Sequence, residues 1–101
     1  MSRQRFTVIL LPEEGGIYGV ICPAIQGCVS QGESIDEALA NIKEAMRALL
    51  ELDREMGKPM PEETTQVVAD EIRAALNDRA EEGLPLTLET REVEIEVEAP
   101  V

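Results

Sequence analysis

The feature that most constrains this sequence is a helix start at Ser34, where Ser34-Ile35-Asp36-Glu37 has the spacing of a capping box. In a capping box the hydroxyl of the first residue and the carboxylate of the fourth each accept a hydrogen bond from a backbone N–H at the helix end. Apolar residues then recur at steps of three and four, which predicts a helix with one stripe buried against a sheet. The stripe consists of Ile35, Ala38, Leu39, Ile42, Ala45, Met46, Leu49, Leu52 and Met56. Gly57 and Pro59 end the helix.

Two apolar segments and a short third segment that ends in a glycine precede this helix, and they predict an antiparallel meander of three strands. Turn residues separate the first two segments, and a connection over residues 23–27 separates the second from the third. The predicted strands cover residues 6–11, 17–22 and 28–32.

A second helix is predicted after a stiff connection that contains Pro59 and Pro61. Thr64 or Thr65 can cap it, and it extends to about Ala80. Its apolar side is narrow, so we expect a peripheral helix or one that packs on a neighbouring subunit. The apolar side consists of Val68, Ile72, Ala75, Leu76 and Ala80.

From Leu86 onward the pattern changes to a period of two, which predicts a further strand with one apolar and one anionic face. The apolar residues are Leu86, Leu88, Val93, Ile95 and Val97, and the anionic face contains Glu92, Glu94, Glu96 and Glu98. A row of glutamates repels itself unless it is solvated or lies opposite a basic surface. Two interpretations stay open: a solvated face that guards against aggregation, or a surface that binds a basic partner.

The charge balance favours a protein partner over nucleic acid. The chain of 101 residues has 21 acidic and 9 basic residues, a net charge of -12 and no histidine. Binding a polyanion depends on Lys and Arg, which here are scattered among acids, whereas an acidic surface accelerates the approach of a basic protein. The alternative is that the acidity only confers solubility.

No apolar run approaches the ~20 residues that a membrane-spanning helix needs, and we expect a cytoplasmic protein without a membrane partner. Cys22 and Cys28 are the only cysteines, and without histidine they cannot assemble an ordinary structural zinc site. We interpret them as small buried hydrophobic residues near strand ends. A disulfide between them is geometrically conceivable but disfavoured in a reducing compartment.

The sequence predicts no catalytic site, no metal site and no cofactor. Histidine, the commonest general base, is missing, and no serine lies in a nucleophile elbow. The glycines near residue 16 do not have the spacing of a phosphate-binding loop. A metal-dependent ribonuclease built from carboxylates is the remaining enzymatic alternative, but the first three predicted strands contain no acidic residue.

The stretch from Ile17 to Ala45 resembles the HicB-like antitoxin family. The family has a strand with glycine and tyrosine, here Tyr18-Gly19, followed by a loop with proline and a Gly-Cys pair, here Gly27-Cys28. A Gly-Glu-Ser corner and a helix with the pattern Glu-Ala-x-x-Asn-x-x-Glu-Ala come next. The order and spacing agree over residues 6–61. This resemblance implies a partial ribonuclease-H-like fold without that enzyme's catalytic acids. It also implies a role in binding and blocking HicA, a small basic toxin that cleaves messenger RNA.

We therefore expect an α+β fold: a three-stranded antiparallel meander, a helix, a further strand and an extra C-terminal helix. Residues 1–101 are expected to form one domain, with a core at 6–61 and a helix-strand extension at 62–101. The DNA-binding domain that many family members carry is not expected, nor is direct nucleic-acid binding. The family implies a homodimer or homotetramer.

The expected function is that of a HicB-like antitoxin for a HicA-type toxin. The first alternative is a solitary HicB-like scaffold without a toxin, and the second is the metal-dependent ribonuclease. The predicted partner-binding residues are Glu92, Glu94, Glu96 and Glu98 in the acidic strand, and Pro23, Ile25, Gln26 and Gly27 in the loop.

Overall fold

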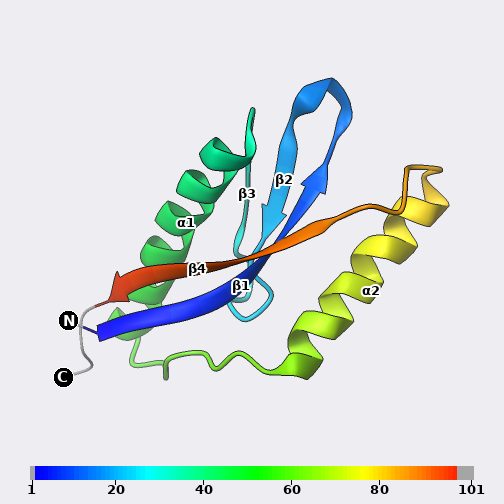
Figure 1. The fold of residues 1–101 in the computed structure, drawn as a ribbon. Coiled ribbons are helices and arrows are strands. Elements are labelled where there is room, and N and C mark those ends of the chain that lie inside the picture. The colour runs from blue at the N-terminus through cyan, green and yellow to red at the C-terminus, as the bar shows by residue number, and fades with distance from the viewer. Residues whose placement is uncertain (1, 98–101) are drawn as a thin grey trace.

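The computed structural model describes residues 2–97 and has a four-stranded antiparallel sheet with two helices (Figure 1). The strands are β1 (Ser2–Pro12), β2 (Tyr18–Ile21), β3 (Val29–Gly32) and β4 (Glu89–Val97). The helices are α1 (Ile35–Glu55) and α2 (Thr65–Glu81), and a short 3-10 turn, Glu14–Gly16, joins β1 to β2. The strand order is β3-β2-β1-β4, so the predicted meander and the added strand are both confirmed.

The sheet narrows to two strands at one end. β1 pairs with β2 only from Ile9 to Pro12, whereas its pairing with β4 runs from Ser2 to Leu10. Residues 2–8 therefore form a two-stranded ribbon with β4 that extends beyond β2 and β3. The sequence predicted only residues 6–11 for this strand, because the polar residues before Phe6 have no apolar signal and are extended through their pairing with β4.

The main core lies between one face of the sheet and α1. Alternate side chains of a strand point to the same face, so Phe6, Val8 and Leu10 of β1 share a face with the apolar row of β4, which is Val93, Ile95 and Val97. From α1 the buried residues are Ala38, Ile42, Met46 and Leu50.

The predicted stripe of α1 is wrong at its C-terminal end. Leu52 and Met56 are exposed, and Leu50 is buried instead. The stripe passes from Met46 to Leu50, one turn later, and Leu52 then lies about 200° around the helix from Leu50.

The start of α1 follows the capping-box prediction in part. The Ser34 Oγ accepts a hydrogen bond from the Glu37 N–H at 3.0 Å, as predicted. The Glu37 carboxylate accepts from the N–H of Glu33 at 3.2 Å, one residue before the cap. Both bonds satisfy backbone donors at the point where the chain leaves β3.

We expect the substitution Ser34→Ala to lower the free energy of unfolding by about 1 kcal/mol, because it removes the acceptor for the Glu37 N–H. Ser34→Asp keeps an acceptor and should retain most of the stability. Urea unfolding followed by circular dichroism measures both changes. Equal losses in the two variants would contradict the assignment of this cap.

Helix α2 lies along β1 on the face opposite α1 (Figure 1). Before the helix, the Glu63 carboxylate accepts hydrogen bonds from the N–H and the hydroxyl of Thr7, at 2.5 and 2.8 Å. Near its end, Arg79 donates to the Pro12 carbonyl at 3.1 Å. Ile9 points to this face and is fully buried. The helix therefore follows β1 from Thr7 toward Pro12.

The prediction for α2 is confirmed in its capping residue and in its peripheral position, with two differences. Thr64 is the cap, and its hydroxyl accepts from the Val67 N–H at 3.1 Å. Ala75 is buried, but the predicted Ala80 is exposed and Arg79 is buried instead. Packing on a neighbouring subunit stays a prediction.

The last strand begins at Glu89, so the prediction of a strand from Leu86 is wrong by three residues. The chain after α2 is held against the helix end, where the Leu84 N–H donates to the Arg79 carbonyl at 2.8 Å. Arg79 Nε also donates to the Pro85 carbonyl at 2.6 Å. These bonds turn the segment before β4, and Leu86 is left exposed.

Candidate partner-binding surfaces

Three glutamates of β4, Glu92, Glu94 and Glu96, have side chains on the face of the ribbon that α1 does not cover. They alternate with Val93, Ile95 and Val97, which are buried toward α1. Glu92, Glu94 and Glu96 are all exposed. Glu98 lies outside the described residues. We call these three glutamates, with Arg3 and Arg5 of β1, the charged ribbon face.

Two arginines of β1 lie directly across from this acidic row. Arg3 is the register partner of Glu96, and Arg5 is the partner of Glu94. The Arg3 Nε lies 3.6 Å from a Glu96 carboxylate oxygen, and an Arg5 guanidinium nitrogen lies 3.8 Å from Glu94. Exposed ion pairs of this kind contribute about 0–1 kcal/mol, so their contribution to folding is small. The cross-strand arginines reduce the electrostatic repulsion among the glutamates, and the glutamate side chains stay exposed.

The sequence prediction missed Arg3 and Arg5. Their spacing of two was a usable signal, because it matches the spacing of Glu94 and Glu96 on an antiparallel neighbour. It could be read only after β4 was known to pair with β1. Glu92 lies opposite Thr7, whose side chain is bonded to Glu63.

The second predicted surface, the loop over residues 23–27, lies between β2 and β3 and forms one wall of a groove. Gln26 and Gly27 are exposed, Pro23 is half-buried, and Ile25 is buried in the core. In this conformation Ile25 holds the loop rather than offering its side chain to a partner. The groove is about 390 Å³. The loop shares its lining with Ile21, Val29, Val67, Asp70 and Glu71.

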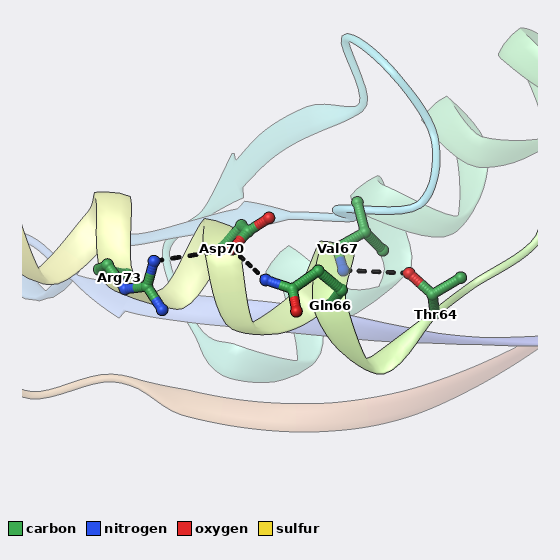
Figure 2. Close-up of polar contacts among 5 residues, drawn as sticks. All are labelled: Thr64, Gln66, Val67, Asp70 and Arg73. Carbon is green, nitrogen blue, oxygen red and sulfur yellow. Dashed lines mark hydrogen bonds and ion pairs between the residues drawn. The ribbon is translucent and has the colours of Figure 1, made fainter.

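Helix α2 supplies the other wall of this groove, which the sequence did not predict. Figure 2 shows the polar contacts in the first turns of this helix. Asp70 accepts a hydrogen bond from the Gln66 side chain at 2.6 Å, and Arg73 lies 3.8 Å away from its carboxylate. The Val67 N–H donates to the hydroxyl of Thr64, the residue that caps this helix. Asp70 and Glu71 place two carboxylates beside the apolar side chains of Ile21 and Val29. A basic side chain can bind such a groove with its charge near the carboxylates and its aliphatic stem on the apolar residues.

The two cysteines hold the base of this loop. The Cys22 N–H donates to the Cys28 carbonyl at 3.0 Å, and the Cys28 N–H donates to the Ile25 carbonyl at 3.1 Å. Both side chains are buried free thiols, as predicted. A hydrogen bond from the Cys22 thiol to the Cys28 sulfur, together with burial, raises the pKa of Cys22; the same bond lowers the pKa of Cys28.

Within residues 2–97 no group of three or more metal-binding side chains is close enough to hold a metal ion. The helices in this range include none that is both long enough and apolar enough to cross a membrane. The two candidate surfaces are the charged ribbon face and the groove between the loop and α2.

Comparison with known proteins agrees with the fold. Residues 6–82 match the family described as HicB-like antitoxin of bacterial toxin-antitoxin system. This match extends past residue 61, where the sequence resemblance ended, and includes α2. Strand β4 and the acidic row lie outside it.

Two further comparisons extend this result. The UPF0150 protein Ta0767 of Thermoplasma acidophilum is 39% identical over 64 residues, which cover 63% of this chain and 93% of that protein. The crystal structure of the N-terminal domain of the Burkholderia pseudomallei antitoxin HicB is similar, with a TM-score of 0.61 and 26% identity. That match covers 95% of this chain and 100% of the domain. A structure of the longer HicB is matched over 93% of this chain and 62% of that one, with a TM-score of 0.60.

Proposed function

Because the chain belongs to the HicB-like antitoxin family of bacterial toxin-antitoxin systems, we propose that it binds and neutralises a small basic toxin of the HicA type. Such a toxin cleaves messenger RNA through a surface that must itself attract a polyanion. An acidic protein that covers this surface competes with RNA for it. The proposed mechanism is steric cover assisted by charge complementarity.

The observation that carries this proposal is the exposed row of Glu92, Glu94 and Glu96 on a strand that pairs with β1 along its whole length. Its apolar neighbours anchor the strand in the core, so the carboxylates are presented at fixed spacing. Fixed backbone positions lower the ordering cost of binding, because only the glutamate side chains have to be immobilised. The net charge of -12 adds a long-range field that steers a cationic protein toward the molecule.

The other parts of the proposal follow from this role. The chain acts by binding, with no catalytic residues, metal or cofactor of its own, and it acts in the cytoplasm. It assembles as a homodimer or homotetramer, for which the narrow apolar side of α2 is a candidate contact. The loop residues Pro23, Gln26 and Gly27, held in place by Ile25, form a second contact with the toxin beside the acidic wall of α2.

The test is affinity purification of the tagged full chain from its native cells, followed by mass spectrometry and light-scattering mass determination. A small basic protein should co-elute in a fixed ratio, and it should degrade RNA only after release from the complex. Recovery of a homo-oligomer alone would favour the solitary scaffold. RNA cleavage by the purified chain itself, dependent on added Mg²⁺ or Mn²⁺, would favour the ribonuclease.

A charge-neutral variant tests the acidic row directly. The triple substitution Glu92→Gln, Glu94→Gln and Glu96→Gln should slow association with the captured toxin by about tenfold at low salt, because steering by charge is reduced. The difference should shrink as salt rises. Association rates are measured by surface-based interferometry with the toxin immobilised.

The matched control is the triple substitution Glu14→Gln, Glu81→Gln and Glu82→Gln, which removes the same number of charges from exposed positions in the β1–β2 turn and at the end of α2. It should change the association rate by less than about twofold. Equal slowing in both variants would mean that net charge, rather than the acidic row, attracts the partner.

A further inference from the structure

We propose that the outer edge of β4 receives an extended strand of the basic partner, which adds to the sheet with arginine or lysine at alternate positions. β4 is the last strand in the order β3-β2-β1-β4, and it spans nine residues, from Glu89 to Val97. In a strand the backbone N–H and C=O groups of alternate residues point to opposite sides. One set bonds to β1, and the other set points outward. This proposal rests on the proposed function for the basic nature of the partner.

The backbone of β4 leaves this edge open for pairing, and its charged side chains restrict which strand can pair there. Strands at the edge of a sheet are usually protected from further pairing by proline, by a bulge, by charged side chains or by being very short. β4 has no proline between Glu89 and Val97, and its register with β1 is continuous over nine pairs from Ser2–Val97 to Leu10–Glu89. A regular edge of this length can accept a strand of similar length.

Charge decides which strand fits. A second copy that paired edge to edge through a twofold axis would place the Glu92–Glu96 row beside the same row of its partner, and like charges directly opposite are destabilising. A strand with basic residues at alternate positions would instead place opposite charges beside the glutamates, which is stabilising. The chain already contains an example on the inner side of β4, where Arg3 and Arg5 face Glu96 and Glu94.

The ribbon also borders a hollow. Arg3, Arg47, Glu94, Ile95 and Glu96 line a hollow of about 480 Å³ at the ribbon. It brings together the backbone of β4, two of the three glutamates and one residue of α1. Side chains of an incoming strand that point toward the α1 side could occupy this space, while its basic side chains face the acidic row.

The test uses amide exchange of the full ¹⁵N-labelled chain, measured by NMR with and without a synthetic peptide. The peptide has nine residues in which arginine alternates with threonine, and the control peptide has the same composition with the arginines in one block. With the alternating peptide, every second amide of β4 should exchange about tenfold more slowly, because those N–H groups gain acceptors. The amides already bonded to β1 should change little.

Several outcomes would overturn the proposal. Protection that is absent from β4, that is equal with the block peptide, or that maps to residues 22–28 and α2 places the basic ligand elsewhere. Protection of both sets of β4 amides in the peptide-free protein, with the mass of a dimer by light scattering, means that a second copy occupies the edge. The variant with Glu92→Gln, Glu94→Gln and Glu96→Gln should reduce the peptide effect, and the control with Glu14→Gln, Glu81→Gln and Glu82→Gln should not.

This experiment separates the edge proposal from the proposed function. If a basic toxin is captured and neutralised but leaves the outward β4 amides unprotected, the edge proposal fails and the antitoxin function stands. If the alternating peptide protects those amides and no toxin is captured, the edge proposal stands and the antitoxin function fails.

Discussion

Replacing Gly32 with alanine is expected to lower the free energy of unfolding by about 3 kcal/mol, with a fall in Tm of about 15 °C. Gly32 ends β3, and the first turn of α1 packs directly on it. A Cβ at this position would lie 2.4 Å from the Ala38 nitrogen and 2.8 Å from the Ala38 Cα. Both atoms belong to the helix backbone, so no side-chain rotation can relieve the contact. The helix must shift, and its buried residues lose their fit to the sheet.

The control for this prediction is Gly19→Ala in the neighbouring strand. A Cβ there would meet the Glu13 side chain at 3.4 Å and the Leu11 carbonyl oxygen at 3.9 Å, which are ordinary contacts with a flexible group and a backbone atom. Its effect should stay below about 1 kcal/mol. Thermal and urea unfolding of both variants measure the difference. Similar stability of the two would show that α1 does not depend on this close approach.

Replacing Arg79 with methionine is expected to cost about 2 kcal/mol of stability. Arg79 is 5% exposed, and its guanidinium group donates to two carbonyls, Pro12 at 3.1 Å and Pro85 at 2.6 Å. It therefore joins the end of β1, the last turn of α2 and the segment before β4. Methionine fills much of the space of the aliphatic stem, but it leaves both carbonyls without this donor. The positive charge also lies in the last turn of a helix, where the helix dipole favours it.

Arg73→Met serves as the matched control, because it makes the same chemical change on the same helix. Arg73 is exposed and faces Asp70 at 3.8 Å, so its loss should cost less than about 0.5 kcal/mol. Urea unfolding gives both values, and amide exchange of α2 reports whether the helix end has loosened. An equal effect of the two substitutions would refute the structural role assigned to Arg79.

The main elements of the fold could be predicted from local patterns. The cap at Ser34, the stripe through Ala38, Ile42 and Met46, and the period of two in β4 each depend on residues near one another in the chain. Capping and burial periodicity are local physical requirements, so they leave a local signature. The errors lie at element ends. The predicted strand start at Leu86 was wrong, because the hydrogen bond from Arg79 to the Pro85 carbonyl turns the chain before β4 begins.

The buried Arg79 and the two surfaces show what local patterns cannot reveal. Arg79 lies four residues after Ala75 and seven after Ile72, so it continued the apolar stripe of α2, but a charged residue there was not recognised as buried. The acidic row of β4 was visible, whereas its arginine partners were not, because they lie about 90 residues away in the chain. The groove wall of Val67, Asp70 and Glu71 required the position of α2.

The sequence alone determined the identity of the elements, the net charge and the family to which the chain belongs, since each is a property of composition or of short-range order. Only the tertiary structure decided which strand neighbours which, that β4 is an edge, and that its glutamates share a face with Arg3 and Arg5. Strand pairing is chosen by the total burial of apolar surface against α1 and by the hydrogen bonds of the whole sheet. These energies are summed over residues far apart in the chain, so no short segment contains enough information to specify the pairing.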